Sequence, residues 1–299
     1  MSAGGTEREA GGTRGLAAVL LGAALLGFAA MLVRWSAPAG PLVIGFYRMA
    51  FALPFVAWMG WRARRQGMAA ARGWALVAGL CFIADLWMWH TSLEYTSAAN
   101  STLLVGLAPL WVAAISVLWL GTRLRKRFWL GLAFALAGGL VLGLAKGARW
   151  GTGRGELLAA LASLAYACFT LALGKARRDL AAPEALAWVV LCCTAGFGLL
   201  GRAGGESFHG FPPHAWLSLA ALGLVVQVAA WWLITWGLGH VPTNLGAVTL
   251  MVQPVATVGL GWVLLGEAVR PVQGVGILLV LAGIALSAFS PPARPATRA

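Results

Sequence analysis

The stretch from Pro242 to Ser290 decides the fold and reads PTNLGAVTLMVQPVATVGLGWVLLGEAVRPVQGVGILLVLAGIALSAFS. It holds two apolar segments, residues 242–265 and 271–289, joined by a short polar connection at 266–270. A helix of about 20 apolar residues spans the roughly 30 Å of hydrocarbon in a bilayer. The stretch therefore predicts a transmembrane helical hairpin.

An earlier part of the chain repeats this hairpin. When the sequence is shifted by 145 residues without a gap, residues 109–138 and 254–283 share 8 identities, among them Pro109 with Pro254 and Gly131 with Gly276. Internal similarity of this kind is typical of transporters that are built from two structural repeats. The sequence therefore predicts two related halves.

The composition excludes a soluble globular domain. Of the 299 residues, 60% are hydrophobic and 10% are charged, and the mean hydropathy is +0.82, so too little polar surface remains to face water. The net charge of +13 does not predict nucleic-acid binding, because basic residues in such a chain collect at membrane edges. The four cysteines lie in apolar segments and predict neither a disulfide framework nor a metal site. No cofactor is predicted.

Ten apolar segments of membrane-spanning length follow one another between clusters of Pro, Gly or Arg. They lie at about 15–35, 41–61, 73–95, 97–120, 127–145, 155–175, 184–201, 214–238, 242–265 and 271–290. The sequence thus predicts an all-α membrane protein with ten transmembrane helices, five in a first repeat (15–145) and five in a second (155–290). Residues 1–14 are predicted to be a disordered cytoplasmic tail because their composition cannot bury a core, and residues 291–299 form a second cytoplasmic tail.

The orientation follows from the lysines and arginines. If the amino terminus is cytoplasmic, 15 of them lie inside and 6 outside, with Arg48 within a span; the outer set is Arg34, Lys146, Arg149, Arg154, Arg202 and Arg270. The positive-inside rule then predicts that both termini lie in the cytoplasm, for a multi-pass protein of the inner membrane. Because five spans, an odd number, separate equivalent positions, the second half is predicted to be inverted relative to the first.

Three ionisable side chains lie clearly inside spans and away from their ends, Arg48, Asp85 and His90, where a charge is costly unless it faces protein or water. Arg48 is either a snorkelling or interhelical arginine that bonds backbone carbonyls, or a coupling group. Asp85 either locks two helices together, or binds the amino group of a substrate, or carries a coupling proton. For His90 a structural hydrogen bond is the favoured interpretation.

Further polar and aromatic residues predict a shared site at mid-depth. Gln227 and Gln253 lie near the middle of their spans, as Asp85 does, and a water-filled cavity explains all three. Asn100 is either a helix N-cap or part of the mouth of the site. With two tryptophans as aromatic walls, the predicted substrate-binding set is Asp85, Trp89, Asn100, Gln227, Trp231 and Gln253. Pro109 and Pro254 are predicted helix kinks beside the cavity.

Two motifs are similar to those of a known family. Pro254 is followed after eleven residues by Gly266-Glu267, with a degenerate copy at 109–122, and the polar run at 85–92 leads into a second run at 95–104. In these motifs the chain resembles the EamA-type branch of the drug/metabolite transporter superfamily, over about residues 15–290. The resemblance implies a central cavity between the two halves and alternating access for small polar organic compounds, typically in the direction of efflux.

The first half departs from the family pattern at one place. Where such proteins often carry Gly-Glu, this chain has Gly121-Thr122. The resemblance therefore predicts a role in positioning the last helix for Glu267 alone, because the first half has no acidic residue at the equivalent position.

Two functions compete on this basis. The favoured one is a transporter that exports a small polar or amphipathic metabolite, such as an amino acid or a related compound, with the proton as candidate coupling ion. The alternative is a membrane-embedded enzyme that acts on a lipid or prenyl substrate, which would need catalytic groups within reach of one another. Asp85 and His90 are the only ionisable pair within about one helical turn, and five residues apart they point in different directions. The sequence therefore predicts that the protein is not an enzyme.

Overall fold

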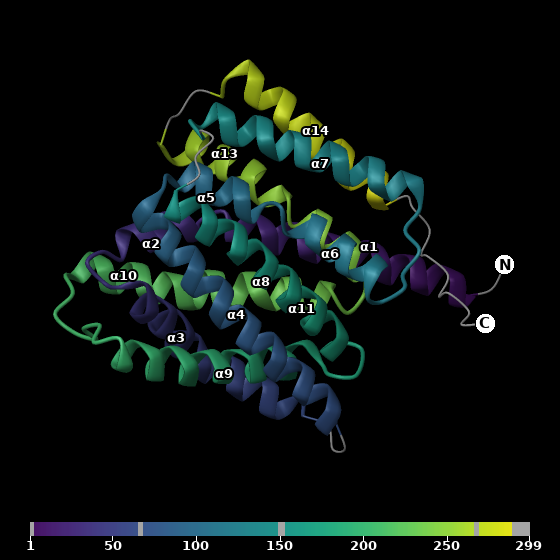
Figure 1. Cartoon of the computed structure of the whole chain (residues 1–299). Coiled ribbons are helices and arrows are strands. Elements are labelled where there is room, and N and C mark those ends of the chain that lie inside the picture. Colours follow the sequence, from purple (N-terminus) through teal and green to yellow (C-terminus); the bar gives the residue numbers. More distant parts are fainter. Residues whose placement is uncertain (1–2, 65–67, 149–152, 266–268, 289–299) are drawn as a thin grey trace.

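The computed structural model describes residues 3–64, 68–148, 153–265 and 269–288, and within these ranges it is helical without a strand (Figure 1). Ten of its helical stretches are long and apolar enough to cross a membrane. The prediction of an all-α membrane protein with ten spans is thus confirmed.

The first half contains five spans. They are formed by α1 (Ala3–Leu26) with α2 (Ala29–Trp35), α3 (Pro41–Arg62), α4 (Ala69–Tyr95), α5 (Ala98–Val105) with α6 (Ala108–Leu118), and α7 (Lys126–Ala145). The second half contains α8 (Arg154–Ala176), α9 (Ala182–Ala203), α10 (Pro213–Ala221) continued by the π-helix η1 (Leu222–Ala230) and α11 (Trp231–Gly237), α12 (Thr243–Thr249) with α13 (Val252–Leu265), and α14 (Pro271–Ala288).

The amino-terminal helix is longer than the sequence predicts. It begins at Ala3, so residues 3–14 are helical where a disordered tail is predicted. Extending a helix that a membrane span has already nucleated adds one hydrogen bond for each residue that is fixed, whereas starting a new helix is unfavourable. Residues 3–14 cannot form a core by themselves, but they still adopt helical structure because an apolar span follows them directly.

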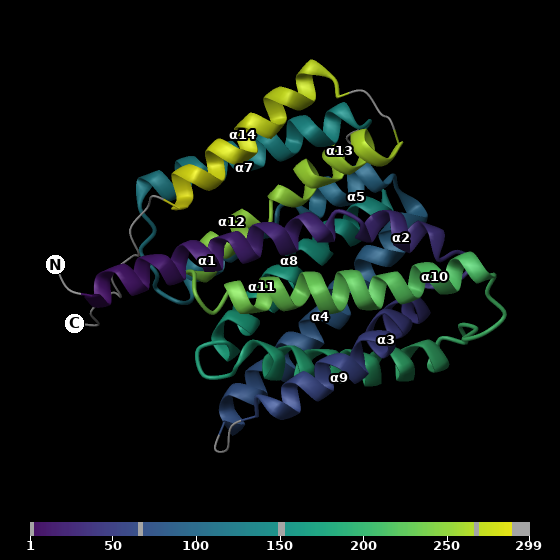
Figure 2. The same ribbon diagram turned by 180° about the vertical axis from the view of Figure 1, so that it is seen from behind.

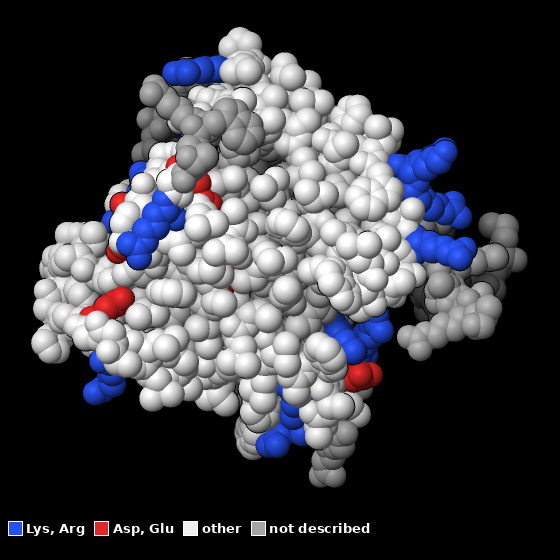
Figure 3. Space-filling model, viewed as in Figure 1, with Lys and Arg blue, Asp and Glu red and all other residues white. Residues whose placement is uncertain are grey.

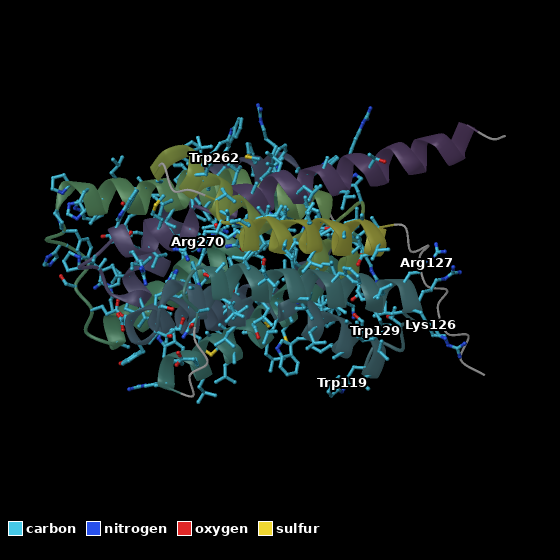
Figure 4. All side chains as sticks on the ribbon, turned by 90° about the horizontal axis from the view of Figure 1, so that it is seen from above. Trp119, Lys126, Arg127, Trp129, Trp262 and Arg270 are labelled. Carbon is cyan, nitrogen blue, oxygen red and sulfur yellow. The ribbon has the colours of Figure 1, made fainter. Side chains whose placement is uncertain are left out.

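The packing between the halves is reciprocal. α7 packs on α14 and α3 packs on α9, so these spans contact their own equivalents, while α4 packs on α8 as α11 packs on α1. Figures 1 and 2 show α7 and α14 lying along each other at one edge of the bundle. Figure 4 shows Lys126, where α7 begins, on one side of this helix pair and Arg270, just before α14, on the other side. The two equivalent helices thus run antiparallel, which is the relation that an inverted repeat predicts.

Four glycines allow α7 and α14 to approach closely. A Cβ atom on Gly138 would lie 2.6 Å from the carbonyl oxygen of Gly276, and one on Gly283 would lie 2.5 Å from the carbonyl oxygen of Gly131. These glycines are two of the identities in the repeat, at 131 with 276 and at 138 with 283. Small residues at such crossings let backbones meet in a membrane, where packing replaces the hydrophobic effect between helices.

Adding one methyl group at this crossing is expected to destabilise the protein. Gly138→Ala and Gly283→Ala should each lower the free energy of unfolding by about 1–3 kcal/mol, because the new Cβ meets backbone that cannot move aside. Gly274→Ala on α14 is the matched control, since a Cβ there has no neighbour within 4 Å. Thermal unfolding in detergent measures the difference. Equal stability of Gly283→Ala and Gly274→Ala would contradict the packing argument.

The charged side chains agree with a membrane-embedded body. Figure 3 shows lysines, arginines and acids gathered toward the ends of the helices, with a broad uncharged surface between them. Such a surface suits the hydrocarbon region of a bilayer, because a charge exposed to lipid is costly.

Candidate functional site

A cavity of about 1190 Å³ lies between the two halves. Its walls come from α4–α7 of the first half and from α8 and α12–α14 of the second, with Gly27, Ala30 and Arg34 of the first span at one side. Both halves therefore contribute to one space, as the two-repeat architecture predicts for a transporter.

The inner part of the cavity is formed where two spans are broken. The fourth span is interrupted at Gly106-Leu107 and the ninth at Leu250-Met251, and all four residues line the cavity. Proline is tolerated in the first turn of a helix, because an amide hydrogen at that position would have no acceptor within the helix. Pro109 and Pro254 lie in the first turns of α6 and α13 and also line the cavity. The predicted kinks are thus short interruptions beside the predicted cavity.

The mouth of the cavity is basic. Arg34, Lys146 and Arg270 line it, and each is exposed at or beside the end of a span. All three belong to the set that the positive-inside rule predicts to lie outside. We call these residues the mouth cations. In the predicted orientation the cavity opens to the outer side.

At the opposite end one hydrogen bond joins the two halves, and the other close contacts lie within the second half. The hydroxyl of Ser116 on α6 donates to the Oδ1 atom of Asn244 on α12 at 2.9 Å. Nearby, a Cβ on Gly174 would lie 2.5 Å from the hydroxyl of Thr243, which shows how closely α8 meets α12. Arg177 donates from Nε to the carbonyl oxygen of Thr235 at 2.7 Å and so satisfies the last turn of α11. The same two broken spans therefore line the cavity at one level and seal it at another.

Aromatic and uncharged polar side chains line the interior. Trp89 and Tyr166 contribute rings, and Thr170, Gln253 and Thr257 contribute polar groups. Gln253 also donates from Nε2 to the carbonyl oxygen of Leu26 at 3.3 Å, at the point where α1 ends. Such a lining, mostly apolar with a few polar groups, is that of a small-molecule site.

Comparisons with known proteins agree with this geometry. The model of the EamA-like transporter family matches residues 13–144 and again residues 153–289. The chain belongs to the EamA-like transporter family. The uncharacterised transporter YwfM of Bacillus subtilis is 25% identical over 272 residues, which cover 85% of this chain and 86% of that protein. Protein RarD of Streptomyces exfoliatus is 29% identical over 266 residues, which cover 83% and 80%. A solved crystal structure shares the fold with a TM-score of 0.75, at 22% identity, over 94% of this chain and 97% of that one.

In this EamA-like transporter, the predicted site residues separate into two groups. Trp89 and Gln253 line the cavity. Asp85, Gln227 and Trp231 are buried outside its lining, with 4%, 0% and 2% of their surface exposed. The structure thus corrects the prediction that Asp85, Gln227 and Gln253 share one cavity. Helix rise fixes the depth of a side chain, but helix packing decides which way it faces.

The buried polar cluster consists of Arg48, Asp85 and Gln227. Arg48 donates from Nε to Oε1 of Gln227 at 3.1 Å, which joins α3 to η1 across the halves. Asp85 attracts Arg48 electrostatically without a direct ion pair between these two described residues. Arg48 is therefore an interhelical donor, as one of the alternatives has it, but the acceptor in this bond is a glutamine side chain and not a backbone carbonyl.

An aromatic cluster of Phe82, Tyr166, Phe169 and Trp231 packs beside these polar groups. Phe82 stacks on Phe169 with ring centroids 4.3 Å apart, and Trp231 meets both rings edge-on at 5.1 and 5.0 Å. The Arg48 guanidinium lies 5.7 Å from the centre of the Phe82 ring. Since Tyr166 also lines the cavity, the aromatic cluster connects the buried polar cluster with the cavity wall.

The remaining predicted residues have structural contacts or lie outside the described ranges. The Nδ1 atom of His90 is 3.0 Å from the carbonyl oxygen of Pro41, a structural hydrogen bond. Ser97, not Asn100, caps α5, and the Asn100 amide donates to Oε1 of Glu156 at 3.0 Å. Glu267 lies outside the residues that the structure describes.

Sequence reasoning missed several residues of the cavity, among them the mouth cations, Tyr166, Thr170 and Thr257. The mouth cations served only to predict orientation, and Tyr166 carried no signal, since one tyrosine in an apolar segment is common. The mouth cations belong to the six basic residues that the sequence places on the outer side, where the positive-inside rule disfavours them. That unusual placement was the feature of the sequence that pointed to a function for them.

Proposed function

We propose that this protein is a secondary transporter that exports small polar or amphipathic metabolites, amino acids or related compounds, across the inner membrane by alternating access. One observation carries the proposal: the cavity between the halves opens at one end, and contacts between the same spans close the other end. A site that is reachable from one side only, at the interface of two repeats, is the geometry on which alternating access depends.

The cavity is the proposed substrate site. Its volume of about 1190 Å³ is at the upper end of the range for small-molecule pockets. Trp89 and Tyr166 would pack against the apolar part of a substrate, while Gln253 would bind a polar group. Export requires the alternate state, in which the mouth closes and the contact between Ser116 and Asn244 opens.

Transport by the reconstituted protein tests the proposal. Purified protein in lipid vesicles is expected to move labelled amino acids or related metabolites down an imposed gradient, faster than protein-free vesicles. The same preparation, incubated with lipid and prenyl substrates, is expected to leave them unchanged. Turnover of a lipid without solute movement would favour the membrane-embedded enzyme and contradict the proposal.

Proton coupling is the finer part of the proposal, with Asp85 as the coupling group. Asp85 lies in the buried polar cluster, and Tyr166 links that cluster to the cavity. Alternating access would expose this acid to one side at a time, and partial desolvation would let it hold a proton.

Asp85→Asn is expected to keep substrate binding but to lose accumulation against a gradient. Asparagine has the size and hydrogen-bonding groups of the protonated acid but cannot release a proton. Substrate-induced thermal stabilisation measures binding, and uptake driven by an imposed pH gradient measures coupling. Accumulation at the parental level by Asp85→Asn would rule out this role.

A further inference from the structure

The charges of the cavity indicate the chemical class of its substrate. Among the described residues that line it, the charged side chains are the mouth cations Arg34, Lys146 and Arg270, and no aspartate or glutamate is present. These three residues come from the first, fifth and tenth spans. Only the tertiary structure brings them to one opening.

Their position is not explained by topology alone. The positive-inside rule disfavours basic residues on the outer side, and the sequence places six there. Three of these six line the cavity mouth. A concave opening lined by one sign of charge raises the local concentration of the opposite ion and speeds its entry.

Two acidic side chains that could instead receive an amine, Glu156 and Asp85, lie outside the cavity lining. Glu156 is not among the residues that line the cavity, and its Oε1 atom accepts hydrogen bonds from Thr96 at 2.6 Å and Asn100 at 3.0 Å. Asp85 is buried outside the cavity lining. The lining therefore offers positive charge at the mouth and rings, amides and hydroxyls farther in.

We infer that the cavity binds small organic anions, carboxylates with an apolar or aromatic body, whose charged group the mouth cations attract and whose body packs against Trp89 and Tyr166. This inference rests on the proposed function and specifies its substrate class. Arginine and lysine form charge-assisted hydrogen bonds with carboxylates, and two arginines allow bidentate pairing.

A set of three probes with one ring system tests the inference. Full-length protein in neutral detergent is mixed with indole-3-acetate, with the neutral indole-3-acetamide, or with the cationic tryptamine, and thermal unfolding is recorded. We expect indole-3-acetate to raise the melting temperature and the other two to leave it unchanged, because a ligand stabilises only the state that it binds. Equal or greater stabilisation by tryptamine or by the amide would overturn the inference.

Charge-neutralising variants localise the effect. The triple variant Arg34→Gln, Lys146→Gln, Arg270→Gln is expected to bind indole-3-acetate at least about tenfold more weakly. Arg202→Gln is the matched control, since Arg202 belongs to the predicted outer set and is exposed at the end of α9, but does not line the cavity. Its affinity should match that of the parent. Parental affinity in the triple variant would overturn the inference, provided that its melting temperature without ligand shows a folded protein.

The anion could also be a lipid headgroup, and a further arm separates the two sources. Short-chain phosphatidylglycerol is compared with short-chain phosphatidylcholine in the same assay. Stabilisation by phosphatidylglycerol in the absence of any effect of indole-3-acetate would overturn the inference of a soluble substrate.

Vesicle transport distinguishes this failure from failure of the proposed function. Movement of tryptamine or of the amide in place of indole-3-acetate would overturn the anion inference and leave a transporter. Absence of movement of every labelled solute would overturn transport itself.

Discussion

Gly139→Trp is expected to lower the transport rate at least about tenfold while leaving the protein folded, because the new side chain would occupy the space that a substrate needs. Gly139 lies on α7 and lines the cavity. A Cβ there has one neighbour, the terminal methyl of Met251 at 2.8 Å, which is the far end of a flexible side chain. The indole would therefore extend into the cavity at the level where the ninth span is broken.

The control for this variant is Gly73→Trp. Gly73 lies on α4, and a Cβ there has no neighbour within 4 Å. Both variants add one indole to a membrane helix, but only one adds it to the cavity. Vesicle transport and thermal unfolding are measured side by side. A parental transport rate in Gly139→Trp would show that the cavity is not the substrate path.

Arg48→Leu is expected to have the largest effect on stability, a loss of about 3 kcal/mol or more. Arg48 is only 2% exposed, donates to Gln227 and attracts Asp85. Its removal leaves the Gln227 oxygen without this donor and leaves the buried Asp85 without the positive charge that attracts it. Unpaired polar groups at membrane depth are costly. Chemical or thermal unfolding in detergent measures the loss.

A double variant separates electrostatics from packing. If the cost arises from an uncompensated Asp85, Arg48→Leu with Asp85→Leu should recover part of the stability, since replacing both charges is far less harmful than removing one. Arg202→Leu, at an exposed arginine, should change stability by no more than about 0.5 kcal/mol. No recovery in the double variant would contradict the proposed coupling between Arg48 and Asp85.

The sequence predicted the spans well because membrane insertion depends on properties that lie along the chain. A helix of about 20 apolar residues satisfies its own backbone hydrogen bonds, so its existence does not depend on its neighbours. The breaks beside Pro109 and Pro254 were also predictable, since proline removes a backbone donor wherever the chain places it. The start of α1 at Ala3 was not, because composition alone ignores the helix that follows.

The candidate site was only partly predictable. Trp89 and Gln253 were placed on the cavity, whereas Asp85 and Gln227 were assigned to it on depth alone and lie in a buried cluster with Arg48. For a helix of 3.6 residues per turn, depth and facing direction are independent quantities.

The sequence by itself thus determined ten membrane spans, two related halves and the places where two spans break, because length, apolarity and proline act locally. Only the tertiary structure decided which polar side chains face the cavity and which are buried together. It also brought Arg34, Lys146 and Arg270 to one mouth. Each of these depends on the rotation of a helix about its axis, and that rotation is fixed by contacts with helices that are distant in the sequence, such as the close approach of Gly138 to Gly276.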